Sequence, residues 1–126
     1  MKTGDTCVLR LPNKIPHLWI IISDPTPNNE VVIVNVTTAD LSVDTSCTIK
    51  RGDHPFIKHE SVIAYHYARL ISVNKITEWK TKHYYESWTS VKYLLLKRIQ
   101  QGAIDSEYTP QKIQGIIIKQ MNKPKK

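Results

Sequence analysis

Short apolar runs in the first half of the chain have the pattern of β-strands. Thr6–Leu11 alternates apolar and polar positions and ends at "PNKIP", where two prolines cannot donate to a sheet. Leu18–Ser23 and Val31–Val36 are nearly continuous β-branched runs, separated by a turn rich in Pro, Asn and Asp. Such runs are typical of strands buried on both faces, as in a small barrel or a tight sandwich.

Two further strands are predicted downstream of these runs. Ser46–Lys50 is a short strand after a polar loop, and Ser61–Leu70 is a longer alternating strand. Its side chains fall on two faces, with Val62, Ala64 and His66 on one and Ile63, Tyr65 and Tyr67 on the other. The next segment, "ISVNKI", is predicted either to continue this strand or to form a short edge strand.

In the last third of the chain the apolar period changes to that of a helix. Ser90–Gln101 carries the stripe Val91, Leu94, Leu95 and Ile99, and Gly102 is predicted to end the helix. A second helix is predicted to begin with Thr109 as its N-cap and Pro110 as its first residue. Its stripe is Ile113, Ile116, Ile117 and Met121. Two amphipathic helices joined by a short loop should pack as a hairpin. The expected fold is therefore mainly β with C-terminal helices.

The net charge of +7 lies almost wholly in the second part of the chain. Residues 1–74 contain seven Lys/Arg and seven Asp/Glu, whereas residues 75–126 contain eleven against four. A basic flank on a neutral body favours a polyanionic partner such as RNA or DNA, although a solvated helix face and the "NKPKK" tail explain part of the excess.

Length and apolar content indicate one domain without a membrane span. A chain of 126 residues is long enough for a single core, and its apolar runs are far shorter than the roughly 18 residues that a span requires. The N-terminus has no apolar signal-peptide region. Cys7 and Cys47 are isolated within strand-like runs, which favours reduced core thiols in a cytoplasmic protein.

The segment Arg51–His59, "RGDHPFIKH", contains the most chemically suggestive residues. His54 and His59 lie there with Arg51, Asp53 and Lys58, and His17 precedes the second predicted strand. Histidine can donate or accept a proton near neutral pH, and Arg or Lys can stabilise charge on a phosphorane. These residue types suit metal-free RNA cleavage, but on their own they fit a merely polar loop with surface histidines better.

Other chemistries have weaker sequence support. There is no phosphate-binding glycine loop, no G-x-S-x-G elbow and no cysteine-based zinc pattern, so no cofactor is expected. A metal-dependent hydrolase using His54, His59 and a carboxylate remains a third possibility, although their spacing matches no firm zinc template.

Several motifs in the first part of the chain resemble the PemK/MazF (CcdB-like) family of mRNA-cleaving toxins. "GDTCVLRLP" with Gly4 and Asp5 is similar to the family's first strand, and "HLWIIISDP" and "VVIVNVTT" stand where its second and third strands belong. "SVIAYHYARL", with Arg69, resembles a later strand of the family. The resemblance covers about residues 4–76.

This resemblance implies an SH3-like β-barrel of about five to seven strands over residues 1–76. Residues 77–126 would then form a basic aromatic segment and the helical hairpin. It also implies a homodimer, an antitoxin partner, and cleavage of single-stranded RNA without metal. Thr37 or Thr38 would lie beside the scissile phosphate. The family's catalytic arginine before the second strand is replaced here by His17, with Lys14 in the shortened loop.

The leading hypothesis is accordingly a cytoplasmic endoribonuclease toxin. The predicted catalytic residues are His17, Thr38, His54 and His59, and the predicted RNA-binding residues are Lys14, Thr37, Ser46, Arg51, Lys58 and Arg69. Trp79, Tyr84, Tyr85 and Trp88 either stack bases or pack against the helices. The alternative is a non-catalytic module that binds nucleic acid or an acidic protein through its basic helices.

Overall fold

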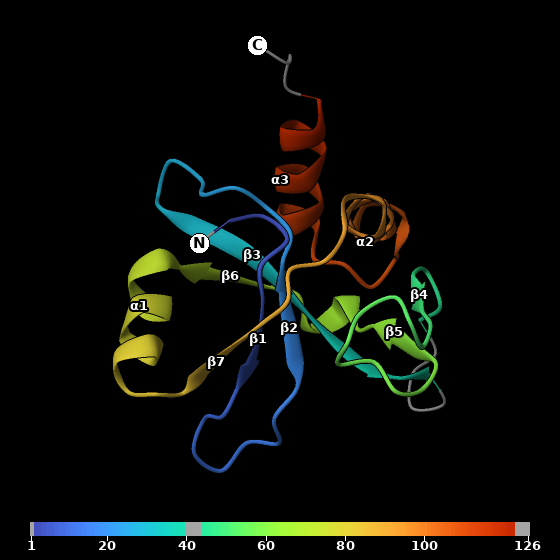
Figure 1. Ribbon diagram of the computed structural model, residues 1–126. Helices are drawn as coiled ribbons and strands as arrows, with labels where there is room; N and C mark the ends of the chain where they lie inside the picture. The colour runs from blue at the N-terminus through green and yellow to red at the C-terminus, as the bar shows by residue number, and fades with distance from the viewer. Residues whose placement is uncertain (1, 40–43, 123–126) are drawn as a thin grey trace.

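An antiparallel β-sheet forms the centre of the protein (Figure 1). The computed structural model describes residues 2–39 and 44–122. Within them, seven strands pair in the order β4-β5-β3-β2-β1-β7, and β6 also pairs with β3. The strands are β1 (Thr6–Leu9), β2 (Leu18–Ile21), β3 (Glu30–Thr38), β4 (Thr48–Ile49), β5 (Ser61–Ile63), β6 (Arg69–Ser72) and β7 (Tyr85–Trp88). The prediction of a mainly β protein with C-terminal helices is confirmed.

The sheet does not close into a barrel. Strand β3 is long enough to have two partners on one edge: its first half, from Glu30 to Ile33, pairs with β6, and Val36 to Thr38 pair with β5. Strands β4 and β7 therefore lie at opposite ends of the strand order rather than against each other. The expected barrel is not confirmed, and the observed arrangement is an open sheet that divides along β3.

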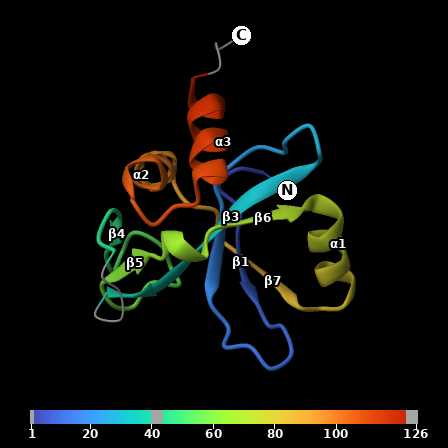
Figure 2. The same cartoon turned by 180° about the vertical axis from the view of Figure 1, so that it is seen from behind.

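Helices cover both faces of the sheet, which explains the continuous apolar runs (Figures 1 and 2). The helices are α1 (Val73–Thr81), α2 (Tyr93–Asp105) and α3 (Gln111–Met121). Along β3, Val32 and Val34 pack in one core cluster with residues of α2 and α3. Val31 and Ile33 point to the other face and pack with Ile76 of α1.

Helix α1 begins inside the segment "ISVNKI", for which only strand was predicted. Within this segment β6 ends at Ser72 and α1 begins at Val73. The Ser72 hydroxyl caps the helix, because it accepts a hydrogen bond from the Lys75 amide at 3.0 Å. Ile76 and Trp79 of α1 are buried against the sheet. The chain then returns as β7, which pairs with β1 and was not predicted either.

The predicted strand Ser61–Leu70 is interrupted. After β5, a single 3₁₀ turn over Tyr65–Tyr67 (η2) turns the chain before β6 begins. Tyr65 is fully buried in this turn, and its hydroxyl donates to the Ile99 carbonyl of α2 at 2.7 Å. The expected alternation over ten residues is therefore wrong, because this contact with α2 fixes a different local conformation. Strand β4 is likewise shorter than the predicted Ser46–Lys50.

The two C-terminal helices are present, are consecutive and contact each other. Figures 1 and 2 show α3 along the vertical of the view and α2 close to end-on. Ile113 and Ile117 of the predicted α3 stripe are buried. Gly102 does not end α2, which continues to Asp105, and Leu94 of the predicted α2 stripe is 76% exposed.

Two simpler features complete the fold. Cys7 and Cys47 are both free and buried, as predicted. No helix in the part of the chain that the structure describes is long and apolar enough to cross a membrane.

Candidate functional site

A pocket of about 480 Å³ contains five of the ten predicted site residues. We call it the central pocket, and the five are His17, Thr37, Thr38, Lys58 and His59. They come from three segments of the chain: the end of the β1–β2 loop, the end of β3, and the loop before β5. The two histidine-bearing segments therefore share one cleft, as the cleavage hypothesis requires.

Strand pairing explains why these segments meet. In the β2–β3 ladder Trp19 pairs with Asn35, so the same register continued by two residues places His17 beside Thr37. On the other edge of β3, Thr38 pairs with Ser61. The Ser61 hydroxyl donates to the His59 carbonyl at 3.0 Å, which holds the end of the loop against β5.

A second hollow, the Arg51 pocket, adjoins the central pocket. It has a volume of about 440 Å³ and is lined by the cations Arg51, Lys58 and Lys92, together with Asp53 and the buried His54. Lys58 lines both pockets. This side of the central pocket therefore has an excess of positive charge suited to a phosphate group.

A third hollow, the Lys14 pocket, lies on the other side of His17. It has a volume of about 380 Å³ and is lined by Lys14, His17, Arg69, Asn35 and Tyr67 among others. His17 lines both this pocket and the central one. The three pockets thus follow one another along the surface, linked by His17 and Lys58.

His54 has a structural environment rather than a catalytic one. Its side chain is 4% exposed, Nδ1 accepts a hydrogen bond from the Phe56 amide at 3.1 Å, and Nε2 donates to the Thr89 carbonyl. Both ring nitrogens therefore have protein partners, and the ring is the tautomer with its proton on Nε2. His54 connects the Arg51–His59 loop to the end of β7.

Ser46 lies apart from the three pockets. Its backbone amide and its hydroxyl both donate to Asp44 Oδ1, at 3.0 and 2.6 Å. Asp44 is buried and accepts a further hydrogen bond from the Ser106 hydroxyl after α2. Ser46 thus belongs to a turn that contacts the helical region. Residues 40–43 of the predicted loop lie outside the described residues.

Of the four aromatic candidates in the segment 77–88, Trp88 is the one that lines the central pocket. Trp79 is buried, and Tyr84 and Tyr85 are half-buried against the cluster under α1. Trp88 is 37% exposed and meets Phe56 edge to face, with the ring centroids 5.1 Å apart. Trp88 therefore offers an aromatic surface within the central pocket.

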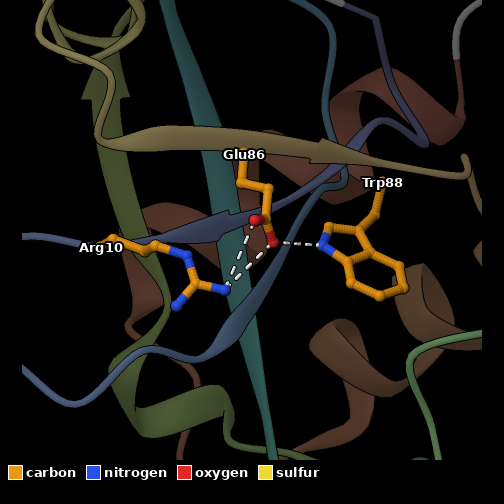
Figure 3. A network of polar contacts seen from close by, with 3 residues as sticks. All are labelled: Arg10, Glu86 and Trp88. Carbon is orange, nitrogen blue, oxygen red and sulfur yellow. Dashed lines mark hydrogen bonds and ion pairs between the residues drawn. The ribbon is translucent and has the colours of Figure 1, made fainter.

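The Trp88 ring is held by a chain of polar contacts (Figure 3). Its indole N–H donates to Glu86 Oε2 at 2.8 Å, and the same carboxylate forms an ion pair with Arg10 at 3.2 Å. The hydrogen bond from Trp88 and that from Arg10 lower the pKa of Glu86, so the carboxylate stays ionised. Glu86 and Trp88 lie on one side of β7 because side chains two apart in a strand share a face.

Two alternative chemistries lack suitable residues. Among the described residues, no group of three or more His, Cys, Asp or Glu side chains is arranged to hold a metal ion. Burial raises the pKa of Cys7 to about 12 and also raises that of Cys47, which keeps both thiols protonated and poorly nucleophilic.

Phe56, Lys92 and Asn35 line these pockets but were not among the predicted site residues. Lys92 follows from no local pattern, because it reaches the Arg51 pocket only through tertiary packing. Asn35 did carry a signal, since it is the single polar residue inside the apolar run "VVIVNV". A polar residue in a strand buried on both faces calls for an explanation.

Comparison with known proteins gives no match: no family model fits the chain, and no curated protein or solved structure is significantly similar to it.

Proposed function

We propose that this protein is a metal-independent endoribonuclease that cleaves single-stranded RNA, as the resemblance to PemK/MazF toxins implies. One observation carries the proposal: His17, His59 and Lys58 line one pocket together with the hydroxyls of Thr37 and Thr38. Two imidazoles, a cation and hydroxyl groups are the set of side chains that phosphodiester transfer to a ribose hydroxyl requires.

In the proposed reaction the ribose 2′-oxygen attacks the adjacent phosphorus and the P–O5′ bond breaks. One of His17 and His59 accepts the proton of the 2′-hydroxyl, and the other donates a proton to the leaving 5′-oxygen. The products are a 2′,3′-cyclic phosphate and a 5′-hydroxyl. Lys58 stabilises the charge on the phosphorane, and the hydroxyls of Thr37 and Thr38 orient the ribose.

Neighbouring pockets would hold the rest of the RNA. Arg51 and Lys92 on one side, and Lys14 and Arg69 on the other, can each bind a phosphate that flanks the scissile one. Trp88 would stack on a base at the central pocket, and its bond to Glu86 reduces the conformational freedom lost on binding. His54 takes a positioning role instead of the predicted catalytic one.

The proposal keeps the other features that the resemblance implies. Residues 1–76 would correspond to the SH3-like barrel of the family, here with its sheet left open. A homodimer, an antitoxin partner and a cytoplasmic location belong to the same proposal. The antitoxin would block the central pocket.

The test is cleavage of a fluorescent single-stranded RNA in the presence of EDTA. Wild-type protein should produce fragments that end in a 2′,3′-cyclic phosphate, and His17→Ala and His59→Ala should each slow cleavage by about 10²-fold or more. His83→Asn is the matched control, because His83 lies in the α1–β7 turn at φ 63° and Asn tolerates that conformation. RNA left intact by the wild-type protein, or cut equally fast by all variants, contradicts the proposal.

A non-catalytic RNA-binding module is the second candidate. It is favoured by the position directly before β2, where His17 stands in place of the arginine that the resemblance implies. In that case the protein binds RNA with a steep salt dependence and leaves it intact.

A further inference from the structure

Asn35 presents an unsatisfied polar atom in the middle of the sheet. The residue is 5% exposed, and its side-chain oxygen Oδ1 has no hydrogen-bond partner among the described residues. Its backbone carbonyl accepts from the amide of Ala64, the residue that follows β5, at 3.0 Å. A buried acceptor without a partner costs about 1–3 kcal/mol, so its presence in an apolar strand needs a reason.

The side chain of Asn35 lines the Lys14 pocket. Trp19, its ladder partner on β2, lines the same pocket, and the largely exposed Ile15 and Tyr67 also contribute to it. Lys14 and Arg69 add two positive charges. The pocket therefore combines a buried amide, apolar and aromatic surface and cations, which is the chemistry that binds a nucleotide.

We propose that the Lys14 pocket is a nucleobase subsite in which the amide of Asn35 recognises the edge of one base of the RNA substrate. The carboxamide offers an acceptor, Oδ1, beside the N–H donors of Nδ2, so it pairs with a base edge that has a donor next to an acceptor. The inference rests on the proposed function for its substrate class. Because His17 lines both pockets, the recognised base is next to the scissile phosphate, and Asn35 determines which sequence is cut.

Asn35→Val separates this role from a structural one. Valine is β-branched and apolar, so it suits a strand buried on both faces and removes the unsatisfied oxygen. The variant should unfold at the same or a higher temperature than wild type while losing its selectivity among bases. Asn35→Thr, which keeps a smaller polar group, serves as a second variant.

The probes are hexamers of 2′-O-methyl adenosine, cytidine or uridine, which cannot undergo 2′-hydroxyl attack, and an abasic hexamer of the same length. Fluorescence anisotropy gives the dissociation constant of each. Wild type should bind its best and worst base-containing hexamers with affinities about tenfold or more apart, since one bidentate contact discriminates by that order. In Asn35→Val the spread should fall below about threefold, with the affinity for the abasic hexamer unchanged.

Gln100→Leu is the matched control. Gln100 is also buried, and its Oε1 also lacks a partner among the described residues, but it lies on α2 and does not line the Lys14 pocket. Gln100→Leu should leave the differences in affinity among the hexamers unchanged.

The subsite is overturned if both Asn35 variants still bind the base-containing hexamers with affinities as far apart as in wild type. It is also overturned if wild type binds no hexamer or binds all of them equally well. A third contrary result is an Asn35 variant that loses as much affinity for the abasic hexamer as for the base-containing ones. Because these are binding measurements, they are independent of cleavage. A wild-type protein that discriminates through Asn35 but leaves RNA intact refutes the nuclease and supports the subsite. A protein that cuts RNA with no dependence on Asn35 supports the nuclease and refutes the subsite.

Discussion

At the residue scale, two glycines in the C-terminal helices have opposite surroundings. A Cβ atom added to Gly102 would collide with the Tyr65 hydroxyl, and it would lie 3.0 Å from Cys47 Cβ. The same atom added to Gly115 would meet no other atom within 4 Å. Close approach of α2 to the 3₁₀ turn therefore requires Gly102, whereas packing does not require Gly115.

Alanine substitutions at these glycines should change stability in opposite directions. Gly102→Ala should lower the free energy of unfolding by about 1–2 kcal/mol, because overpacking outweighs the gain in helix propensity. Gly115→Ala should raise it by about 0.5–1 kcal/mol through propensity alone. Urea denaturation of both variants measures the two signs, and equal effects would contradict the packing argument.

The two histidines of the Arg51–His59 loop should have different roles, with His54 needed for stability and His59 for RNA cleavage. His54→Ala should lower the free energy of unfolding by about 2–3 kcal/mol, because the buried ring leaves a cavity and the Phe56 amide loses its partner, while the Thr89 carbonyl keeps only the Thr6 hydroxyl. His59 is exposed, so His59→Ala should change stability by less than about 0.5 kcal/mol while reducing RNA cleavage. The measurements are denaturant unfolding and the cleavage assay; a stable His54→Ala variant would contradict the structural role.

The sequence identified the residue types of the central pocket but not the role of each residue. His17, Lys58 and His59 stood out because imidazoles and cations near predicted loops suit phosphate chemistry. That His54 is buried depends on how its loop folds over Thr89, which no local pattern encodes. Ser46 was predicted to bind RNA, but its turn is held by Asp44 against the helical region.

At the element scale, the Ser72 side chain caps the start of α1. Ser72 is extended, with φ −69° and ψ 144°, and its hydroxyl accepts from the Lys75 amide. This bond satisfies one of the free amides of the first turn, and Ser72 is both the last residue of β6 and the N-cap of α1.

Ser72→Ala should therefore lower the free energy of unfolding by about 1 kcal/mol. The exposed Ser87 of β7 provides the control, because Ser87→Ala removes a hydroxyl at no helix terminus. Thermal unfolding followed by circular dichroism measures both. An equal loss in the two variants would show that the cap does not determine where α1 begins.

Strands that are buried on both faces were predictable, and the elements that cover them were not. Runs such as "VVIV" predict a strand whatever elements pack around it, so β1, β2 and β3 were predicted from their composition. Helix α1 buries only Ile76 and Trp79, too few apolar positions to identify a helix over nine residues. The position of α1 is set by the sheet face that it covers and that of β7 by the edge of β1 with which it pairs, and both are tertiary effects.

At the scale of the whole molecule, two separate groups of positive charges could each bind RNA. One set, including Lys58 and Arg51, surrounds the linked pockets, and the other, including Lys112 and Lys119, lies on α3. The nuclease proposal assigns RNA to the first set, whereas a helical binding module would use the second.

Salt dependence of RNA binding distinguishes the two regions. For single-stranded RNA, Lys58→Ala should reduce the slope of log affinity against log salt by about 0.7, because one phosphate contact is lost. Lys119→Ala is the charge-matched control and should leave the slope unchanged. The opposite result would place RNA on the helices. A filter-binding titration at several salt concentrations measures both slopes.

Strand β3 is paired along both edges, with β2 on one side and β6 and then β5 on the other. Each of its backbone amides points to one of these two edges, so it reaches solvent only when the strand paired on that edge separates. In deuterium-labelling experiments the amides of Val32 to Val36 should exchange last, at the rate of global opening. The threonines at the end of β3 would thus be anchored to the slowest-exchanging segment of the protein, so substrate would meet them in one fixed position.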